Sequence, residues 1–324
     1  VTIVVAIAVV IGFATAAGKR GGQEGLEVEN LNNKFRDLAA TLKKSVLGKA
    51  DARKEQKAQK KQRKDDAKKS SERPRSFVID FKGDLKASAV PSLREEVSAV
   101  LDVATTEDEV LLRLENPGGM VHEHGLAASQ LVRIREAGIP LTVIVDKVAA
   151  SGGYLMACVA NRIVAAPFAI LGSIGVLAQI PNFNRLLDSH GVNVEQITAG
   201  KYKRTVTMFG ENSDEDRAKL REELEDVHLL FKGAVAKYRP DLDLDKVATG
   251  EHWYGTRALE LGLADELRTS DEYLRERSSE RDLYRIAFNI KRPLQKRIAA
   301  GMDSALEKAA ASRWRHWFES RLPR

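Results

Sequence analysis

Ser151 is the residue whose surroundings most favour nucleophilic chemistry. It lies between Ala150 and Gly152, after a strand-forming run and at the start of a stretch of small residues that predicts a helix. An exposed nucleophile needs this kind of placement, with small neighbours on either side. A serine before a helix is also an ordinary N-cap residue, so both interpretations stand on this evidence alone.

A base must accompany a serine nucleophile, because the hydroxyl is weakly nucleophilic by itself. The histidines lie in no recognisable triad motif, although two of them follow Gly119 closely enough to approach the site. The run His122-Glu123-His124 favours a surface loop over a metal site, because adjacent positions on one short segment rarely converge on a metal. The six histidines are His122, His124, His190, His228, His252 and His316.

Lysine is the other candidate base, and the basic segment 200–204 contains Lys201, Lys203 and Arg204. A free lysine has a pKa near 10.4, so only about one molecule in 2,500 is neutral at pH 7. Burial among apolar groups lowers this pKa by several units, and neighbouring cations assist. A solvated basic turn is the alternative interpretation of this segment.

Glycine pairs follow two of the predicted strands. Gly118-Gly119 come after the strand that ends at Leu114, and Gly152-Gly153 come after the strand that ends at Val145. Glycine lets the backbone approach a ligand closely. Amide groups at a helix N-terminus suit an anion or a developing oxyanion.

The elements that must position these residues alternate between strands and helices. This alternation is typical of an α/β protein with a mainly parallel sheet. Apolar runs predict strands at 77–81, 110–114, 141–145, 162–166, 171–177 and 192–197. Helical periodicity predicts helices at 91–104 and 124–137, and a helix of small residues that ends at Ala160.

Charge is distributed unevenly along the 324 residues, whose net charge is +6. Residues 18–75 contain 18 Lys/Arg against 9 Asp/Glu, and residues 281–324 contain 11 against 4. The intervening residues 76–280 have a net charge of −10, which argues against a nucleic-acid-binding domain. The single cysteine, Cys158, excludes a disulfide framework within the chain and a multi-cysteine zinc site.

The first 18 residues carry no charge until Lys19. As a helix they extend roughly 27 Å, which is barely the thickness of the bilayer core, and they predict a transmembrane anchor. A signal peptide is the competing interpretation, because Ala14-Thr15-Ala16 fits a cleavage site. Residues 19–75 predict a basic charged linker that also suits anionic lipid head groups. The positive-inside rule would place the following domain in the cytoplasm.

Five segments, taken in order, resemble the signal peptide peptidase family of membrane serine proteases, most closely its SohB-like branch. They cover roughly residues 76–270. They are ENPGG at 115–119, AASGGY at 149–154, GSIGV at 172–176, GKYK at 200–203, and a segment with Trp253, Gly255, Ala258, Gly262, Leu263, Ala264 and Asp265.

This resemblance implies a ClpP/crotonase-like fold of repeated β-β-α units and a Ser–Lys dyad that cleaves peptides without a metal or cofactor. Ser151 would be the nucleophile, Lys203 the general base, and Ser173 the residue that orients the lysine. The family often has Ser where Asn116 precedes Pro117, and we expect no catalytic consequence from this difference. The oxyanion hole would come from Gly118, Gly119 and Gly152.

The resemblance also implies a dome-shaped homo-oligomer at the bacterial inner membrane. It places the catalytic domain in the periplasm, opposite to the side that the basic linker predicts. Apolar residues near Ser151 suggest a preference for small or aliphatic side chains in the substrate. These residues are Val148, Leu155, Met156, Ile174 and Val176.

The expected organisation is an anchor at 1–18, a linker at 19–75, a protease domain at 76–280 and a basic C-terminal tail at 281–324. Leu294, Ile298, Met302 and Leu306 recur every four residues and predict an amphipathic helix at 293–310. Two alternative functions remain open. One is a crotonase-like acyl-CoA enzyme, which would use a Glu or Asp in place of the dyad, and the other is a non-catalytic membrane scaffold.

Overall fold

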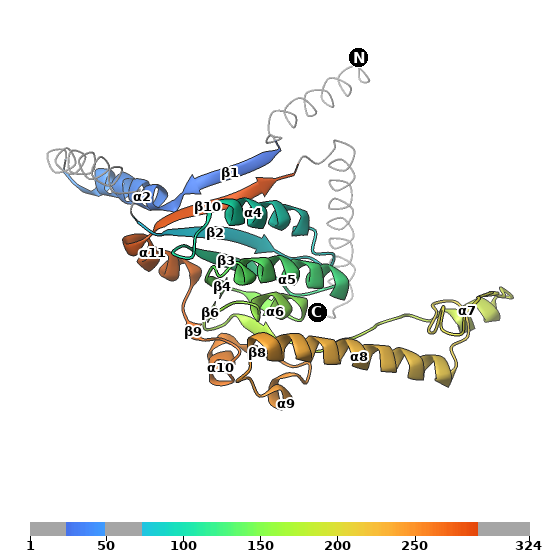
Figure 1. Ribbon diagram of the computed structural model, residues 1–324. Coiled ribbons are helices and arrows are strands. Elements are labelled where there is room, and N and C mark those ends of the chain that lie inside the picture. Colours follow the sequence, from blue (N-terminus) through green and yellow to red (C-terminus); the bar gives the residue numbers. More distant parts are fainter. Residues whose placement is uncertain (1–23, 49–72, 291–324) are drawn as a thin grey trace, which may run out of the picture. The chain divides into compact units, whose positions relative to one another are not determined.

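The computed structural model describes residues 24–48 and 73–290 (Figure 1). One compact unit, Glu27–Ala287, contains the site and almost all of the secondary structure. The other unit comprises Val1–Leu26 and Phe288–Arg324, of which residues 24–26 and 288–290 are described.

A seven-stranded sheet in the order β1-β10-β2-β3-β4-β6-β9 forms the centre of the fold. From β10 to β9 each neighbouring pair is parallel, which confirms the predicted α/β class with a parallel sheet. A second sheet has the order β5-β7-β8. The strands are β1 (Gly25–Asn30), β2 (Arg75–Lys82), β3 (Glu109–Glu115), β4 (Leu141–Val145), β5 (Val148–Ala150), β6 (Arg162–Ala165), β7 (Ile170–Gly172), β8 (His252–Tyr254), β9 (Glu266–Leu267) and β10 (Asp282–Asn289).

Helices cover both faces of the large sheet, so its central strands are buried on each side, as is usual for parallel sheets. Ile79, Leu112 and Val143 point into the main core on one face, whereas Val78, Leu111 and Ile144 point into a smaller core on the other. The helices are α2 (Leu31–Val46), α4 (Val90–Val103), α5 (Val121–Glu136), α6 (Gly152–Ala157), α7 (Asn184–Ser189), α8 (Asp214–Tyr238), α9 (Leu244–Val247), α10 (Gly255–Glu260) and α11 (Ser270–Glu280).

Most of the predicted elements are confirmed to within a few residues: β2, α4, β3, α5, β4 and β6 all lie where the apolar patterns placed them. Two predicted strands differ. The strand expected at 171–177 ends at Gly172, and residues 192–197 have no regular structure and are exposed to solvent. An apolar run alone does not make a strand where no neighbouring strand is available for pairing.

The predicted linker at 19–75 is wrong for its described part, because β1 and α2 lie within it and belong to the fold. Asn32, at the start of α2, is buried, and its side-chain amide donates to the carbonyls of Ser278 and Arg281. Its Oδ1 accepts from the N–H of Leu283 in β10. The predicted tail boundary at 281 is wrong for the same reason, because β10 is an interior strand of the sheet.

No helix within residues 24–48 and 73–290 is both long enough and apolar enough to cross a bilayer. The anchor predicted at 1–18 and the amphipathic helix predicted at 293–310 lie outside the described residues.

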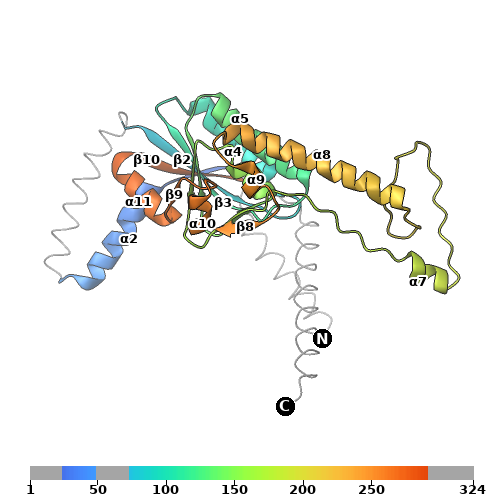
Figure 2. The same cartoon turned by 90° about the horizontal axis from the view of Figure 1, so that it is seen from below.

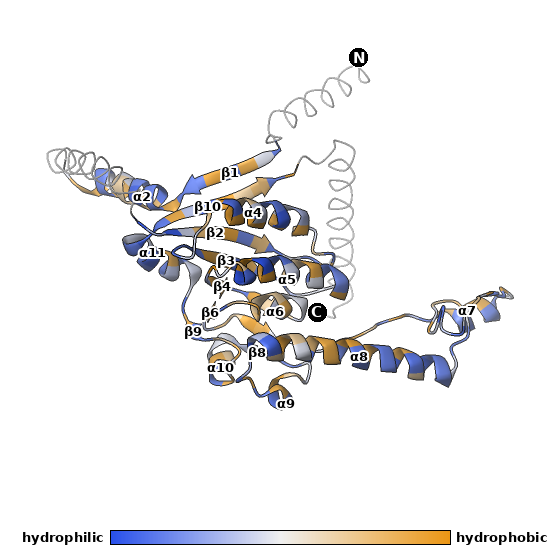
Figure 3. Ribbon diagram, in the orientation of Figure 1, coloured by the Kyte–Doolittle hydropathy of each residue, from blue (hydrophilic) through white to orange (hydrophobic). Residues whose placement is uncertain are grey.

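Between β7 and α8 the chain makes a long excursion that contains α7; we call residues 177–212 the α7 arm. Figures 1 and 2 both show α7 beside the N-terminal end of α8, away from the sheet. Within the arm, the N–H of Phe183 donates to the carbonyl of Met208, and the rings of Phe183 and Phe209 stack. Figure 3 shows hydrophobic and hydrophilic residues interspersed along α8, and Leu229 and Leu230 of this helix are exposed.

Candidate active site

Ser151 lies at the junction between β5 and α6 with an uncommon backbone conformation. Its φ is 53° and its ψ is −122°, a combination that strains a residue with a side chain. Its N–H donates to the carbonyl of Gly172 at 2.8 Å, and its carbonyl accepts from the N–H of Leu155 at 3.0 Å. The hydroxyl makes no capping hydrogen bond, so the N-cap interpretation explains its position but not its side chain.

Gly118 and Gly152 meet at Ser151. Gly118 has a φ of 90°, and a Cβ there would lie 2.7 Å from the Ser151 Cβ and 2.9 Å from the Gly152 amide nitrogen. A Cβ on Gly119 would lie 2.3 Å from the carbonyl oxygen of Leu85. Only glycine fits at these positions. The structure therefore brings together the three glycines that the sequence suggested for an oxyanion site.

Ser173 also lies close to Ser151, because β5 and β7 pair in parallel. Ala150 is opposite Gly172 in this register, so each serine immediately follows a paired residue. Ser173 has a φ of 51°, and its N–H donates to the carbonyl of Glu251 at 2.6 Å.

Lys203 is the one predicted site residue that the structure does not bring to Ser151. It is exposed on the α7 arm. The residues before it contact the start of α8, where Lys201 pairs with Glu215 at 3.0 Å and Lys219 Nζ lies 5.1 Å from the Tyr202 ring centroid.

The length of α8 separates this contact from Ser151. The part of α8 that lines the cavity at Ser151 begins at Val227, eight residues after Lys219. Eight helical residues span about 12 Å. Lys203 therefore lies with the start of α8 and is not among the residues that line the cavity at Ser151.

Lys201 does not replace Lys203 as a base in this arrangement. Hydrogen bonds with Tyr202 and with Glu215 raise the pKa of Lys201 above its ordinary value. A general base at neutral pH needs a lowered pKa. Lys201 accordingly behaves as a solvated cation, as the alternative interpretation of the basic segment suggested.

An apolar cavity of about 210 Å³ opens at Ser151 between α5, α6 and α8. α8 is held against this region by a contact of 3.2 Å between His228 Nε2 and the carbonyl of Ile174. Of the apolar residues expected near the site, Leu155 and Val176 line the cavity, whereas Met156 and Ile174 are buried in the core. The lining consists of Gly119, Val121, His124, Gly125, Ser151, Gly152, Leu155, Gly175, Val176, Val227, Leu230, Phe231 and Ala234.

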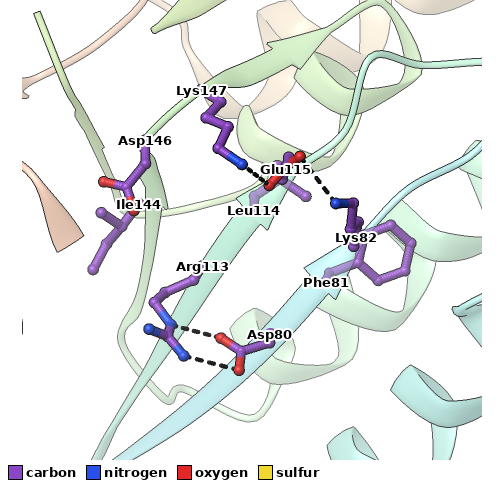
Figure 4. A pocket seen from close by; sticks show the side chains of 9 residues that line it. All are labelled: Asp80, Phe81, Lys82, Arg113, Leu114, Glu115, Ile144, Asp146 and Lys147. Carbon is purple, nitrogen blue, oxygen red and sulfur yellow. Dashed lines mark hydrogen bonds and ion pairs between the residues drawn. The ribbon is translucent and has the colours of Figure 1, made fainter. Parts of the chain in front are cut away.

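A second cavity of about 320 Å³ lies at the carboxyl ends of β2, β3 and β4 (Figure 4). Arg113 binds Asp80 through two hydrogen bonds of 2.6 and 2.9 Å, and Glu115 pairs with Lys82 and Lys147. Burial opposes the ionisation of Asp80, but hydrogen bonds from Arg113 and Arg285 lower its pKa overall. Each of these charged side chains has an oppositely charged partner, so the cluster is best explained as structural.

Two residues beside the site were given no role from the sequence, although His124 follows Gly119 closely enough to approach it. Asn116 is fully buried, and its side-chain oxygen accepts from the Gly118 N–H at 2.9 Å. His124 is also fully buried and lines the cavity at Ser151, whereas His122 is exposed beside Glu123. The available signals were the asparagine in place of the family's usual serine and the position of His124 on the inner face of α5.

Within residues 24–48 and 73–290, no group of three or more His, Cys, Asp or Glu side chains is arranged to hold a metal ion. Cys158 is buried, and this burial raises the pKa of its thiol to about 12. The reactive thiolate is therefore scarce at neutral pH.

Comparison with known proteins places the chain in a family. Residues 1–131 match the family described as "Peptidase family S49 N-terminal", and residues 133–283 match "Peptidase family S49". "Probable protease SohB" of Haemophilus influenzae is 48% identical over 285 residues, which cover 84% of this chain and 81% of that protein. "Probable protease SohB" of Buchnera aphidicola subsp. Acyrthosiphon pisum is 53% identical, covering 72% and 69%.

Among solved structures, a mutant of the 1510-N membrane-bound stomatin-specific protease in complex with a substrate peptide aligns with a TM-score of 0.44 and 12% identity. The alignment covers 71% of this chain and 98% of that one. The family is shown by the two peptidase family matches and the two long, similar relatives. They confirm the resemblance found in the sequence motifs, and the chain belongs to peptidase family S49 and is a peptidase.

Proposed function

We propose that this chain is a serine endopeptidase with Ser151 as its nucleophile and Lys203 as its general base, on a ClpP/crotonase-like fold. The observation that carries the proposal is the position of Ser151. A strained backbone presents its hydroxyl at the start of α6, beside Gly118 and Gly152 and at an apolar cavity. In this proposal Ser173 orients the lysine.

The chemistry follows from these roles. Lys203, as a neutral amine, takes the proton of the Ser151 hydroxyl while Oγ attacks the carbonyl carbon of the scissile peptide bond. Amides near Gly119 and Gly152 bind the resulting oxyanion, and each such donor contributes roughly 100-fold or more to the rate. The amine leaves with the proton from Lys203, and water then hydrolyses the acyl-enzyme.

The position of Lys203 requires a second component of the proposal. The α7 arm leaves large apolar side chains in solvent, including Ile197 at 93% and Leu177 at 83% exposure. Large apolar side chains exposed in this way are typical of a surface that binds another protein chain. We propose that the chain forms a homo-oligomer. In the oligomer the α7 arm would pack against the sheet and helices around Ser151, of its own or of another copy, and so bring Lys203 to Ser151.

Substrate selection follows from the cavity at Ser151. Its lining is almost wholly apolar, so a small or aliphatic side chain next to the scissile bond would lose water on binding without leaving a charge unpaired. The proposed substrates are peptides and membrane-associated or misfolded polypeptides.

Location is proposed from the sequence. The uncharged residues 1–18 would anchor the chain in the bacterial inner membrane by a single span, with membrane lipid at the basic linker. The family resemblance favours a periplasmic catalytic domain, and a reporter fused after residue 324 tests the side. Neither the acyl-CoA enzyme nor the non-catalytic scaffold gains support, because both matching family descriptions are peptidases.

Labelling with a fluorophosphonate probe tests the proposed function. Wild type should be labelled and should hydrolyse a denatured protein, whereas Ser151→Ala and Lys203→Ala should do neither. Lys201→Ala is the matched control, because it removes a lysine from the same exposed segment. Full activity in Lys203→Ala would refute its role as the base, and labelling of Ser151→Ala would refute the nucleophile.

A further inference from the structure

A buried chain of polar contacts lies directly behind the candidate oxyanion site. Asn116 Oδ1 accepts from the Gly118 N–H at 2.9 Å and lies 3.1 Å from His124 Nε2. The other ring nitrogen, Nδ1, lies 3.0 Å from the carbonyl oxygen of Met120. The amide nitrogen of Asn116 donates to the sulfur of Met156 at 3.2 Å.

The contacts determine which atoms donate. The Gly118 N–H is a donor only, so the Asn116 oxygen must face it, and a flipped amide would set two donors against each other. His124 Nε2 therefore carries a hydrogen and donates to Asn116. His124 Nδ1 faces the carbonyl oxygen of Met120, so both ring nitrogens lie against protein groups.

The ring of His124 fills the space between the two glycines at the site. A Cβ on Gly152 would lie 2.5 Å from His124 Cγ, and a Cβ on Gly119 would lie 2.8 Å from His124 Cε1. The side chain is fully buried. It thus contacts both backbone segments whose amides would bind the oxyanion, and its hydrogen bonds hold the turn from Asn116 to Met120.

We propose that His124 and Asn116 are positioning residues that set the geometry of the oxyanion hole of this peptidase. The inference rests on the proposed function, because it assumes that the oxyanion forms at Ser151. His124 acts through the backbone of Gly118–Met120 and Gly152. Both of its nitrogens are engaged with Asn116 and Met120, so it is not placed to accept the serine proton.

The decisive measurement separates binding of the tetrahedral state from binding of the ground state. A peptide aldehyde forms a hemiacetal with Ser151 and develops charge on its oxygen, whereas the matching peptide alcohol binds without a covalent bond. His124→Ala and Asn116→Ala should each lower kcat about 100-fold and weaken aldehyde affinity by a similar factor. KM and alcohol affinity should change less than about threefold, as expected for an interaction specific to the transition state.

His122→Ala is the matched control, because it removes an exposed histidine from the same helix two positions away, and it should behave as wild type. The double variant of Asn116 and His124 should lose little more than either single variant, since the two residues act as one unit. Where His124→Ala does not fold, His124→Gln and Asn116→Ala provide the same comparison, with circular dichroism checking the fold.

Equal losses of aldehyde and alcohol affinity would show a purely structural role and would overturn the inference. So would wild-type kcat in His124→Ala, or single-variant losses that multiply in the double variant. Failure of the proposed function is distinguishable, because wild type would then show no hydrolysis that depends on Ser151.

Discussion

Ser151 and Ser173 occupy equivalent positions at the ends of two neighbouring parallel strands. Ala150 of β5 pairs with Gly172 of β7, and the serine that follows each has a φ near +50°. The 21 residues between them in the chain form α6, β6, a turn and β7, which return the backbone to the same edge. The pairing explains how two serines distant in sequence come to lie at the ends of adjacent strands.

Relief of backbone strain is expected when Ser151 is replaced by glycine. The φ and ψ of Ser151 suit glycine, and such a conformation costs a residue with a side chain about 1–3 kcal/mol. Ser151→Gly should therefore have a free energy of unfolding about 1 kcal/mol higher than Ser151→Ala, after the larger unfolded-state entropy of glycine is subtracted. Urea titration of the two inactive variants measures the difference.

Ser129, on the exposed side of α5, provides the matched control. There the difference in free energy of unfolding between the glycine and alanine variants should have the opposite sign. In a regular helix glycine is less stable than alanine by about 1 kcal/mol. Ser129→Gly should accordingly unfold more easily than Ser129→Ala. The same sign at both positions would show that Ser151 is not strained in solution.

The central strands and the first helices were predictable because their apolar residues recur with clear periods. Val110 to Leu114 and Leu141 to Val145 are apolar except for Arg113 and Thr142, as expected for strands covered on both faces. The place of α2 and β10 was not predictable in this way. Their attachment depends on buried Asn32, whose three hydrogen bonds to residues about 250 positions away have no local signal.

The residues of the candidate site also differ in how far the sequence predicts them. Gly118, Gly119 and Gly152 were predictable because close backbone approach admits only glycine. The contact between Asn116 and His124 depends on tertiary packing, and the helical position of His124 shows only that it can face inward. The position of Lys203 likewise depends on the direction of the α7 arm. The sequence of residues 177–212 has no hydrophobic periodicity that would predict this direction.

Complementation between inactive chains tests how Lys203 reaches Ser151. The α7 arm of one copy could supply Lys203 to Ser151 of another copy. In that case co-expressed Ser151→Ala and Lys203→Ala chains should form mixed oligomers with activity that neither variant has alone. The reason is that a mixed pair retains one intact serine and one intact lysine at the same site. Hydrolysis of a fluorogenic peptide by the purified mixture measures this. Inactive mixtures with demonstrated subunit exchange would instead show that each arm folds back on its own chain.

Charge introduced at Leu230 should change substrate selection. Leu230 lines the cavity at Ser151, whereas Leu229 does not, although both are largely exposed at 67% and 61%. Leu230→Asp should lower kcat/KM for substrates with an aliphatic side chain about tenfold or more, because binding would desolvate the carboxylate. Leu229→Asp should leave kcat/KM within about twofold of wild type. Equal effects at the two positions would place the binding pocket elsewhere.

Lowering the pH should reduce the free energy of unfolding, because Asp108 becomes protonated. Burial opposes the ionisation of this carboxylate, but hydrogen bonds from Arg75 and Thr105 outweigh burial and lower its pKa to about 2. A pKa below the unfolded value contributes stability above about pH 4 that is lost as the pH falls toward 2. Asp108→Asn should therefore lower the free energy of unfolding by about 2 kcal/mol at pH 7, and the difference should narrow between pH 4 and pH 2. Urea titrations of both proteins across this range check the sign, and a difference that widens in acid would contradict it.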